Sequence, residues 1–180
     1  MNIHRLIATT FAAPMLLAFF CAFNSAQAHV SLDQKTASAG SYQKLTFRVG
    51  HGCEGSASTA ITVLLPEGFN GAKAMPKPGW TIATSAAGKP AGAREISWKG
   101  GPLPDEQFDE FNLLVKLPDA PGKQVLKVIQ QCEKGRAEWT ELPGVAGKYP
   151  APVLEIVPAG AVPAAPGAAA MPDHAGMSHH

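Results

Sequence analysis

Charge is scarce in this sequence, and no stretch of it is strongly basic. Charged residues form 16% of the 180 residues, with 15 Lys and Arg against 14 Asp and Glu. One of the 15, Arg5, lies in an N-terminal segment that we expect to be removed, so 14 residues of each sign remain. A balanced chain without a basic cluster does not fit a nucleic-acid-binding protein or one that adheres to membranes through charge.

The common motifs of catalysis are missing as well. The chain has no G-x-S-x-G, no H-E-x-x-H and no phosphate-binding loop. The acidic stretch from Asp105 to Glu110 lacks the spacing and central glycine of a calcium loop, so we interpret it as a solvated turn before a strand. Gly100-Gly101 is interpreted as a turn only. Motifs therefore point to no enzyme class.

Long apolar runs are absent except near the N-terminus. The run from Leu6 to Phe23 follows the positive Arg5 and precedes the small residues Ala26 and Ala28, which is typical of a secretory signal peptide over residues 1–28. The alternative is a membrane anchor, because the run is close to the lower length of a span. We expect cleavage after Ala28, a periplasmic or secreted protein, and no transmembrane anchor after removal of the signal.

Cysteines are few. Cys21 lies in the predicted signal, which leaves Cys53 and Cys132. In an oxidising compartment two cysteines predict one disulfide. It would close a loop of roughly 80 residues and stabilise the fold by about 4 to 5 kcal/mol on the chain-entropy model. The alternative is a pair of thiolate metal ligands.

No segment keeps a helical period of 3.6, whereas short alternating segments recur between Gly and Pro residues. This pattern predicts an all-β domain over residues 29–158, an antiparallel β-sandwich that is Ig-like or cupredoxin-like, with a small barrel as the alternative. The predicted strands are Val30–Leu32, Tyr42–Val49, Ala60–Leu65, Trp80–Thr84, Glu95–Lys99, Phe108–Leu117, Val125–Gln131, Glu138–Glu141 and Val153–Val157.

Residues 159–180 have a different composition. An Ala/Pro/Gly run predicts a disordered linker, since it cannot form a core. The tail ends with Met and His residues. Thioether and imidazole together suit Cu(I), and imidazole suits Cu(II). We interpret the tail as an auxiliary copper-capture element, against the alternatives of an accidental polar tail or a purification remnant. Its candidate ligands are His174, Met177, His179 and His180.

His29 is the strongest candidate metal ligand. After cleavage it becomes the first residue, and its α-amine and imidazole then chelate one ion, a nitrogen set that suits copper. Glu54 lies beside Cys53 in a glycine-rich loop, where a disulfide would hold its carboxylate as a third ligand. The alternative for each is a solvated side chain. His51 in the same loop is a second candidate, which would give a two-histidine site. Trp139, brought near by the disulfide, either covers the site or packs in the core.

Four features resemble the YcnI-like copper-binding proteins, a family first described as a domain of unknown function. They are the Ala-His-Val at His29, the segment His51–Ser56 followed by Leu65–Phe69, the Pro78-Gly79-Trp80 triplet, and Gln131-Cys132-Glu133 with Gly135 and Trp139. The resemblance spans the chain from His29 to Pro158. It implies an extracytoplasmic β-sandwich that binds Cu(II) through the amine and imidazole of His29, with Glu54 completing the site and Trp139 alongside. Many relatives end in a transmembrane helix, whereas this chain ends in the Met/His tail.

Our functional prediction is an exported, non-enzymatic Cu(II)-binding protein for copper chaperoning, buffering or homeostasis. Its expected partners are the copper ion and a membrane copper transporter or another periplasmic copper protein. One alternative is a copper-dependent oxidase, similar to polysaccharide monooxygenases, with His29 and His51 as ligands. Another is an adhesion or structural sandwich that binds no metal.

Overall fold

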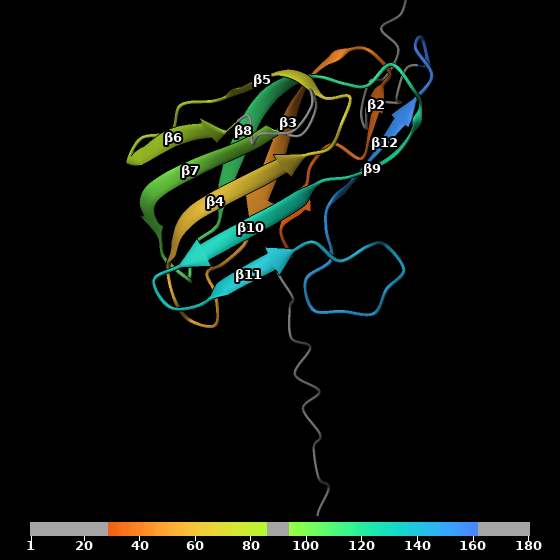
Figure 1. Cartoon of the computed structure of the whole chain (residues 1–180). Coiled ribbons are helices and arrows are strands. Elements are labelled where there is room, and N and C mark those ends of the chain that lie inside the picture. The colour runs from red at the N-terminus through yellow and green to blue at the C-terminus, as the bar shows by residue number, and fades with distance from the viewer. Residues whose placement is uncertain (1–28, 86–93, 162–180) are drawn as a thin grey trace, which may run out of the picture.

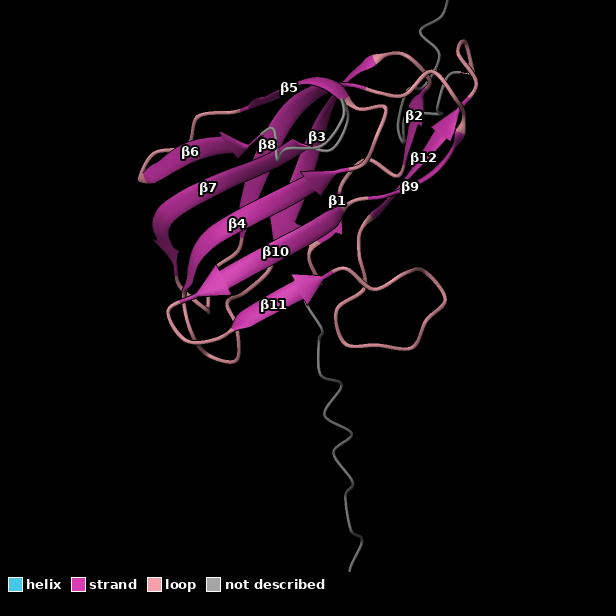
Figure 2. Ribbon diagram, viewed as in Figure 1, coloured by secondary structure: helices cyan, strands magenta, loops and turns pink. Residues whose placement is uncertain are grey.

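The computed structural model describes residues 29–85 and 94–161, and all regular structure within them is β-strand (Figure 2). None of these residues forms a helix, and so none forms one able to cross a membrane. The predicted signal peptide and the tail ligands His174, Met177, His179 and His180 lie outside the described residues. The strands are β1 (Ser31–Leu32), β2 (Thr36–Ser38), β3 (Tyr42–Val49), β4 (Ser58–Leu65), β5 (Asn70–Ala74), β6 (Trp80–Ser85), β7 (Arg94–Leu103), β8 (Asp109–Lys116), β9 (Gly122–Val125), β10 (Lys127–Cys132), β11 (Arg136–Trp139) and β12 (Val153–Val157).

Two sheets lie face to face and form the sandwich (Figure 1). One has the strand order β1-β3-β8-β5, and the other has the order β11-β10-β4-β7-β6. A third, small sheet of order β2-β12-β9 lies at one end. Every pairing is antiparallel except that of β12 with β2. The predicted all-β, largely antiparallel sandwich is therefore confirmed. The domain limits at residues 29 and 158 remain predictions.

The core lies between the two large sheets and follows the alternation of the sequence. In β3, Leu45, Phe47 and Val49 are fully buried, while Arg48 on the opposite face is exposed. Thr46, also on the opposite face, is buried as well, and its amide donates to the side chain of Gln34. Because successive side chains of a strand point to opposite faces, this pattern places one face of each strand in the core. The same holds for β4 and β8. The largest fully buried side chain is Trp98 of β7, as expected for a core tryptophan.

Some sequence predictions were wrong. Gly100-Gly101 is not a turn but part of β7, where Gly100 pairs with Trp80 of β6. Both glycines have a positive φ, and a Cβ at Gly101 would lie 2.7 Å from the indole of Trp80. Glycine is therefore required here by close packing and backbone conformation rather than by chain reversal. Strands β2 and β5 were not predicted, and the predicted strand Val125–Gln131 is divided between β9 and β10.

Candidate metal site

His29 is held at its place by the residues that follow it. Val30 is 3% exposed in the core, and β1 pairs with β3 through Ser31 and Leu32. This anchoring leaves the side chain of His29 exposed at the end of the sandwich. Its imidazole lies 5.8 Å, centroid to centroid, from the indole of Trp139. His29, the first residue of the predicted mature chain, thus lies next to β11, an edge strand of the five-stranded sheet.

Glu54 occupies a tight turn between Cys53 and Ser56. The amide of Cys53 donates to the carbonyl of Ser56 at 2.9 Å, and the amide of Ser56 donates back to Cys53 at 3.0 Å. The central residues, Glu54 and Gly55, have φ values of 51° and 82°. Positive φ at both central positions is the geometry of a type I′ turn. It is uncommon for a residue with a side chain, and such strained residues cluster at functional sites.

Two features fix this turn on the molecule. The predicted disulfide between Cys53 and Cys132 is formed, with a Cα–Cα distance of 6.0 Å, and it ties the turn to the end of β10. A Cβ at Gly52 would overlap the carbonyl oxygen of Ser56. The main chain at Gly52 can therefore pass close to Ser56 only because residue 52 is glycine. Glu54 therefore has an anchored main chain, although its side chain is exposed.

The carboxylate of Glu54 accepts a hydrogen bond of 2.8 Å from the ammonium of Lys148. This hydrogen bond, together with the positive charge of Lys148, holds the pKa of Glu54 below its ordinary value of 4.5. Lys148 also lies 5.1 Å above the ring of Tyr149, and the hydrogen bond to Glu54 raises the pKa of Lys148 well above its usual range. Glu54 is thus an ionised carboxylate at neutral pH, the form in which it binds a metal ion.

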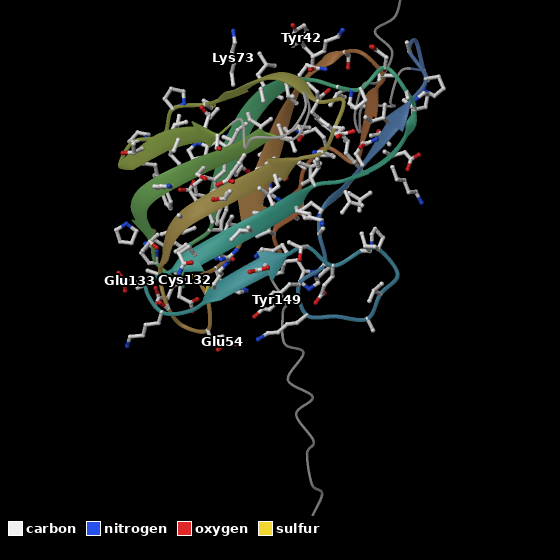
Figure 3. The ribbon with its side chains drawn as sticks, in the orientation of Figure 1. Tyr42, Glu54, Lys73, Cys132, Glu133 and Tyr149 are labelled. Atoms are coloured by element: carbon white, nitrogen blue, oxygen red, sulfur yellow. A yellow bond between two sulfur atoms is a disulfide. The ribbon has the colours of Figure 1, made fainter. Side chains whose placement is uncertain are left out.

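Trp139 forms the inner wall of the site. It is 3% exposed, and its indole contacts Tyr149 edge to face at 5.1 Å. Its Nε1 donates to the buried side chain of Gln130 at 3.0 Å. Trp139 therefore packs in the core, as one of its two alternatives predicted, and it also lines a pocket. That it covers a metal ion stays a prediction. Figure 3 shows Glu54, Cys132 and Tyr149 at one end of the sandwich, opposite the end that carries Tyr42 and Lys73.

These residues enclose a pocket of about 80 Å³. Its walls are formed by His29, His51, Gly52, Cys53, Glu54, Ala137, Trp139, Lys148 and Tyr149. The three residues predicted for the copper site therefore lie around one pocket, as does the alternative ligand His51. Within residues 29–85 and 94–161, no three His, Cys, Asp or Glu side chains are grouped as a metal cluster. A one-histidine site does not require such a group, because the amine supplies a ligand.

His51 has a restricted ring. Its Nδ1 hydrogen-bonds the carbonyl oxygen of Gly52 and lies 4.0 Å from a carboxylate oxygen of Asp105. Since a carbonyl oxygen only accepts, Nδ1 is the protonated nitrogen, and only Nε2 is left for a metal ion. Asp105, which the sequence placed in a solvated turn, thus faces a histidine of the pocket.

Three residues of this region were not predicted from the sequence: Lys148, Tyr149 and Gln130. Lys148 and Tyr149 lie in the irregular segment between β11 and β12, and nothing in its composition indicates a fold back onto Glu54. Gln130, in contrast, could have been identified from the sequence pattern. It occupies a buried position of the alternating strand β10, between Val128 and Cys132, where an apolar residue is the usual choice.

The fold and pocket define a class of protein: an Ig-like β-sandwich with a histidine, a carboxylate and a tryptophan around a small pocket at one end. Residues 29–156 match the family described as a domain of unknown function (DUF1775), and the chain belongs to this family. The resemblance to the YcnI-like family is thereby confirmed. No curated protein matches the chain.

The chain is similar to the following two solved structures. The chain is 31% identical to an uncharacterized protein from Nocardia farcinica with an immunoglobulin-like fold, with a TM-score of 0.62 and coverage of 71% of this chain and 97% of that one. A cohesin module from a Clostridium perfringens family 33 glycoside hydrolase is 10% identical, with a TM-score of 0.49 and coverage of 72% and 96%. The Nocardia protein supports the Ig-like alternative for the sandwich.

Proposed function

We propose that this protein is exported and binds one Cu(II) ion, for copper chaperoning, buffering or homeostasis. The ligands would be the α-amine and imidazole of His29 and the carboxylate of Glu54, with Trp139 beside the ion. The observation that carries the proposal is that His29, Glu54 and Trp139, which are far apart in the sequence, line one small pocket. The membership of the DUF1775 family is consistent with it.

The chemistry of these groups suits the metal. Two nitrogens and a carboxylate oxygen match the preference of Cu(II), and the aromatic walls of Trp139 and Tyr149 would limit access of water. The amine and imidazole must both be deprotonated to bind, so binding weakens as the pH falls. Lys148 donates a hydrogen bond to Glu54, and the ion has to compete with this contact.

The position of the pocket would allow transfer of the ion to a partner. It lies at the end of the sandwich, with His29 and the side chains of Glu54 and Lys148 exposed. A membrane copper transporter or another periplasmic copper protein has direct access to ligands in such a place. The export step depends on the predicted signal peptide, and cleavage after Ala28 creates the amine ligand.

The experiment that tests this function is a Cu(II) titration followed by tryptophan fluorescence, on protein that begins at His29. Paramagnetic Cu(II) is expected to quench Trp139, and Trp139→Phe identifies its share of the signal. Glu54→Gln is expected to weaken binding by at least about 10-fold, because one ligand is lost. Glu133→Gln is the matched control, since Glu133 lies near the disulfide but does not line the pocket.

His51→Ala in the same titration separates the proposal from its main alternative. We expect its Cu(II) affinity to stay within about 2-fold of the parent protein, since the site has one histidine. Loss of binding in His51→Ala, with little effect of Glu54→Gln, would instead favour the two-histidine site of a copper oxidase. Absence of tight binding in the parent protein would favour a structural sandwich.

The Met/His tail is proposed as an auxiliary copper site that takes Cu(I). Deletion of Met171 to His180 is expected to lower the number of Cu(I) ions bound and to leave Cu(II) binding unchanged, because thioether ligands prefer the softer ion. Binding of each ion is measured by competition with a chromogenic chelator. Loss of Cu(II) binding on deletion would contradict this division between tail and pocket.

A further inference from the structure

Gln130 is a polar side chain in the mostly apolar interior of the sandwich. It is 1% exposed, and among the described residues the other buried polar side chains are Thr46, Ser58 and Ser97. A buried amide is costly unless its polar atoms are hydrogen-bonded, and a replacement by Leu or Met would suit a core position better. The presence of Gln here therefore calls for a specific reason.

The amide of Gln130 joins three separate segments. Its Oε1 accepts from Nε1 of Trp139 at 3.0 Å, and its Nε2 donates to the carbonyl oxygen of His51 at 2.6 Å and to the hydroxyl of Ser58 at 2.8 Å. An indole N–H can only donate and a carbonyl oxygen can only accept, so the orientation of the amide is fixed by its partners. A flipped amide would lose both of these contacts.

Two of these contacts reach residues that line the candidate metal pocket. Trp139 lines it, and so does the segment from His51 to Glu54. The same strand, β10, reaches this segment again through the disulfide of Cys132 with Cys53. Two attachments, two residues apart on β10, fix the orientation of the segment more firmly than one attachment can.

We propose that Gln130 is a positioning residue that sets the separation between the indole of Trp139 and the turn that carries Glu54. It touches no metal ion itself. In the metal-free protein it fixes the indole ring and the main chain at His51. Its effect on copper binding rests on the proposed function, because the same separation determines whether His29 and Glu54 reach one ion beside Trp139.

The test compares Gln130→Met with Gln131→Met. Met has a similar volume to Gln but makes none of the three hydrogen bonds. Gln131 is the matched control, because it is the next residue of β10, on the exposed face, and its amide contacts only main-chain oxygens of Cys132 and Gly135. The readouts are the near-UV circular dichroism of the metal-free proteins and the Cu(II) dissociation constant.

We expect Gln130→Met to lose the near-UV tryptophan band assigned by Trp139→Phe and to bind Cu(II) about 10-fold more weakly, as is typical when the support of a metal ligand is removed. Gln131→Met is expected to keep the band and to stay within about 2-fold in affinity. A near-UV spectrum of Gln130→Met that equals that of Gln131→Met would overturn the proposal, whether or not copper binds.

Gln130→Glu keeps the test decisive if the Met variant does not fold. Its carboxylate still accepts from the indole of Trp139 but cannot donate to the carbonyl of His51. It is therefore expected to retain the near-UV band and to lose copper affinity by about 10-fold. If the parent protein does not bind Cu(II), the proposed function fails, while the metal-free spectra still decide whether Gln130 positions Trp139.

Discussion

A protein that carries an eight-residue Gly/Ser leader before His29 is expected to bind Cu(II) at least about 100-fold more weakly than the same protein after the leader is removed. Removal exposes the α-amine, which then closes a chelate ring with the imidazole of the same residue. The second ligand of a chelate binds at a high effective concentration, so the loss of one end costs far more than one independent contact. Both nitrogens are ligands that copper prefers.

The comparison uses one polypeptide before and after cleavage by a protease that leaves His29 as the first residue. The leader has to be longer than two residues, because a terminal amine one or two residues before a histidine chelates Cu(II) with the intervening amides. His29→Ala without a leader is the control and should bind as weakly as the uncleaved protein. Equal quenching of Trp139 before and after cleavage would place the copper elsewhere, at His51 or in the tail.

The strands that could be predicted are those whose pattern is set by burial of one face. The predicted strand Tyr42–Val49 and β3 have the same ends, because apolar residues alternate with polar ones until the glycine after Val49. Val153–Val157 was likewise found as β12. In such segments the sequence contains both the period of the strand and the side that faces the core.

The strands that were missed depend on distant partners. β5 consists of Asn70–Ala74, whose core-facing residues are only the small Ala72 and Ala74, and it is a strand because it pairs with β8. Gly100-Gly101 has the composition of a turn, and only the approach of Trp80 shows why small residues are needed inside β7. Local propensity is overridden in both places by tertiary contacts.

The residues of the candidate site also differ in whether a local signal in the sequence indicates them. His29 was found from its place after a cleavage motif, and Glu54 from its place beside a cysteine, so both depended on local signals. Lys148 and Gln130 act through contacts with residues 94 and 79 positions away in the sequence, and no local pattern records such contacts. Whether His29 and Glu54 bind copper remains a prediction that the titrations decide.

Replacement of both cysteines, as Cys53→Ala with Cys132→Ala, is expected to lower the free energy of unfolding by about 4 to 5 kcal/mol. The disulfide joins residues 79 positions apart, so its removal frees a long loop in the unfolded chain and raises the entropy of that state. Because a domain of this size is stable by about 5 to 15 kcal/mol in total, the loss removes a large share of it.

Guanidinium unfolding of the parent protein, the double variant and the parent protein treated with a thiol reductant measures this effect. The last two should have the same midpoint and a steeper denaturant dependence than the oxidised protein, because an unfolded chain without the crosslink exposes more surface. A difference below about 1 kcal/mol would contradict the chain-entropy account. Without denaturant, the double variant should also bind Cu(II) more weakly, because the turn of Glu54 loses its covalent link to β10. It then keeps only non-covalent contacts there, among them those of Gln130 with His51 and of Lys134 with Ser56.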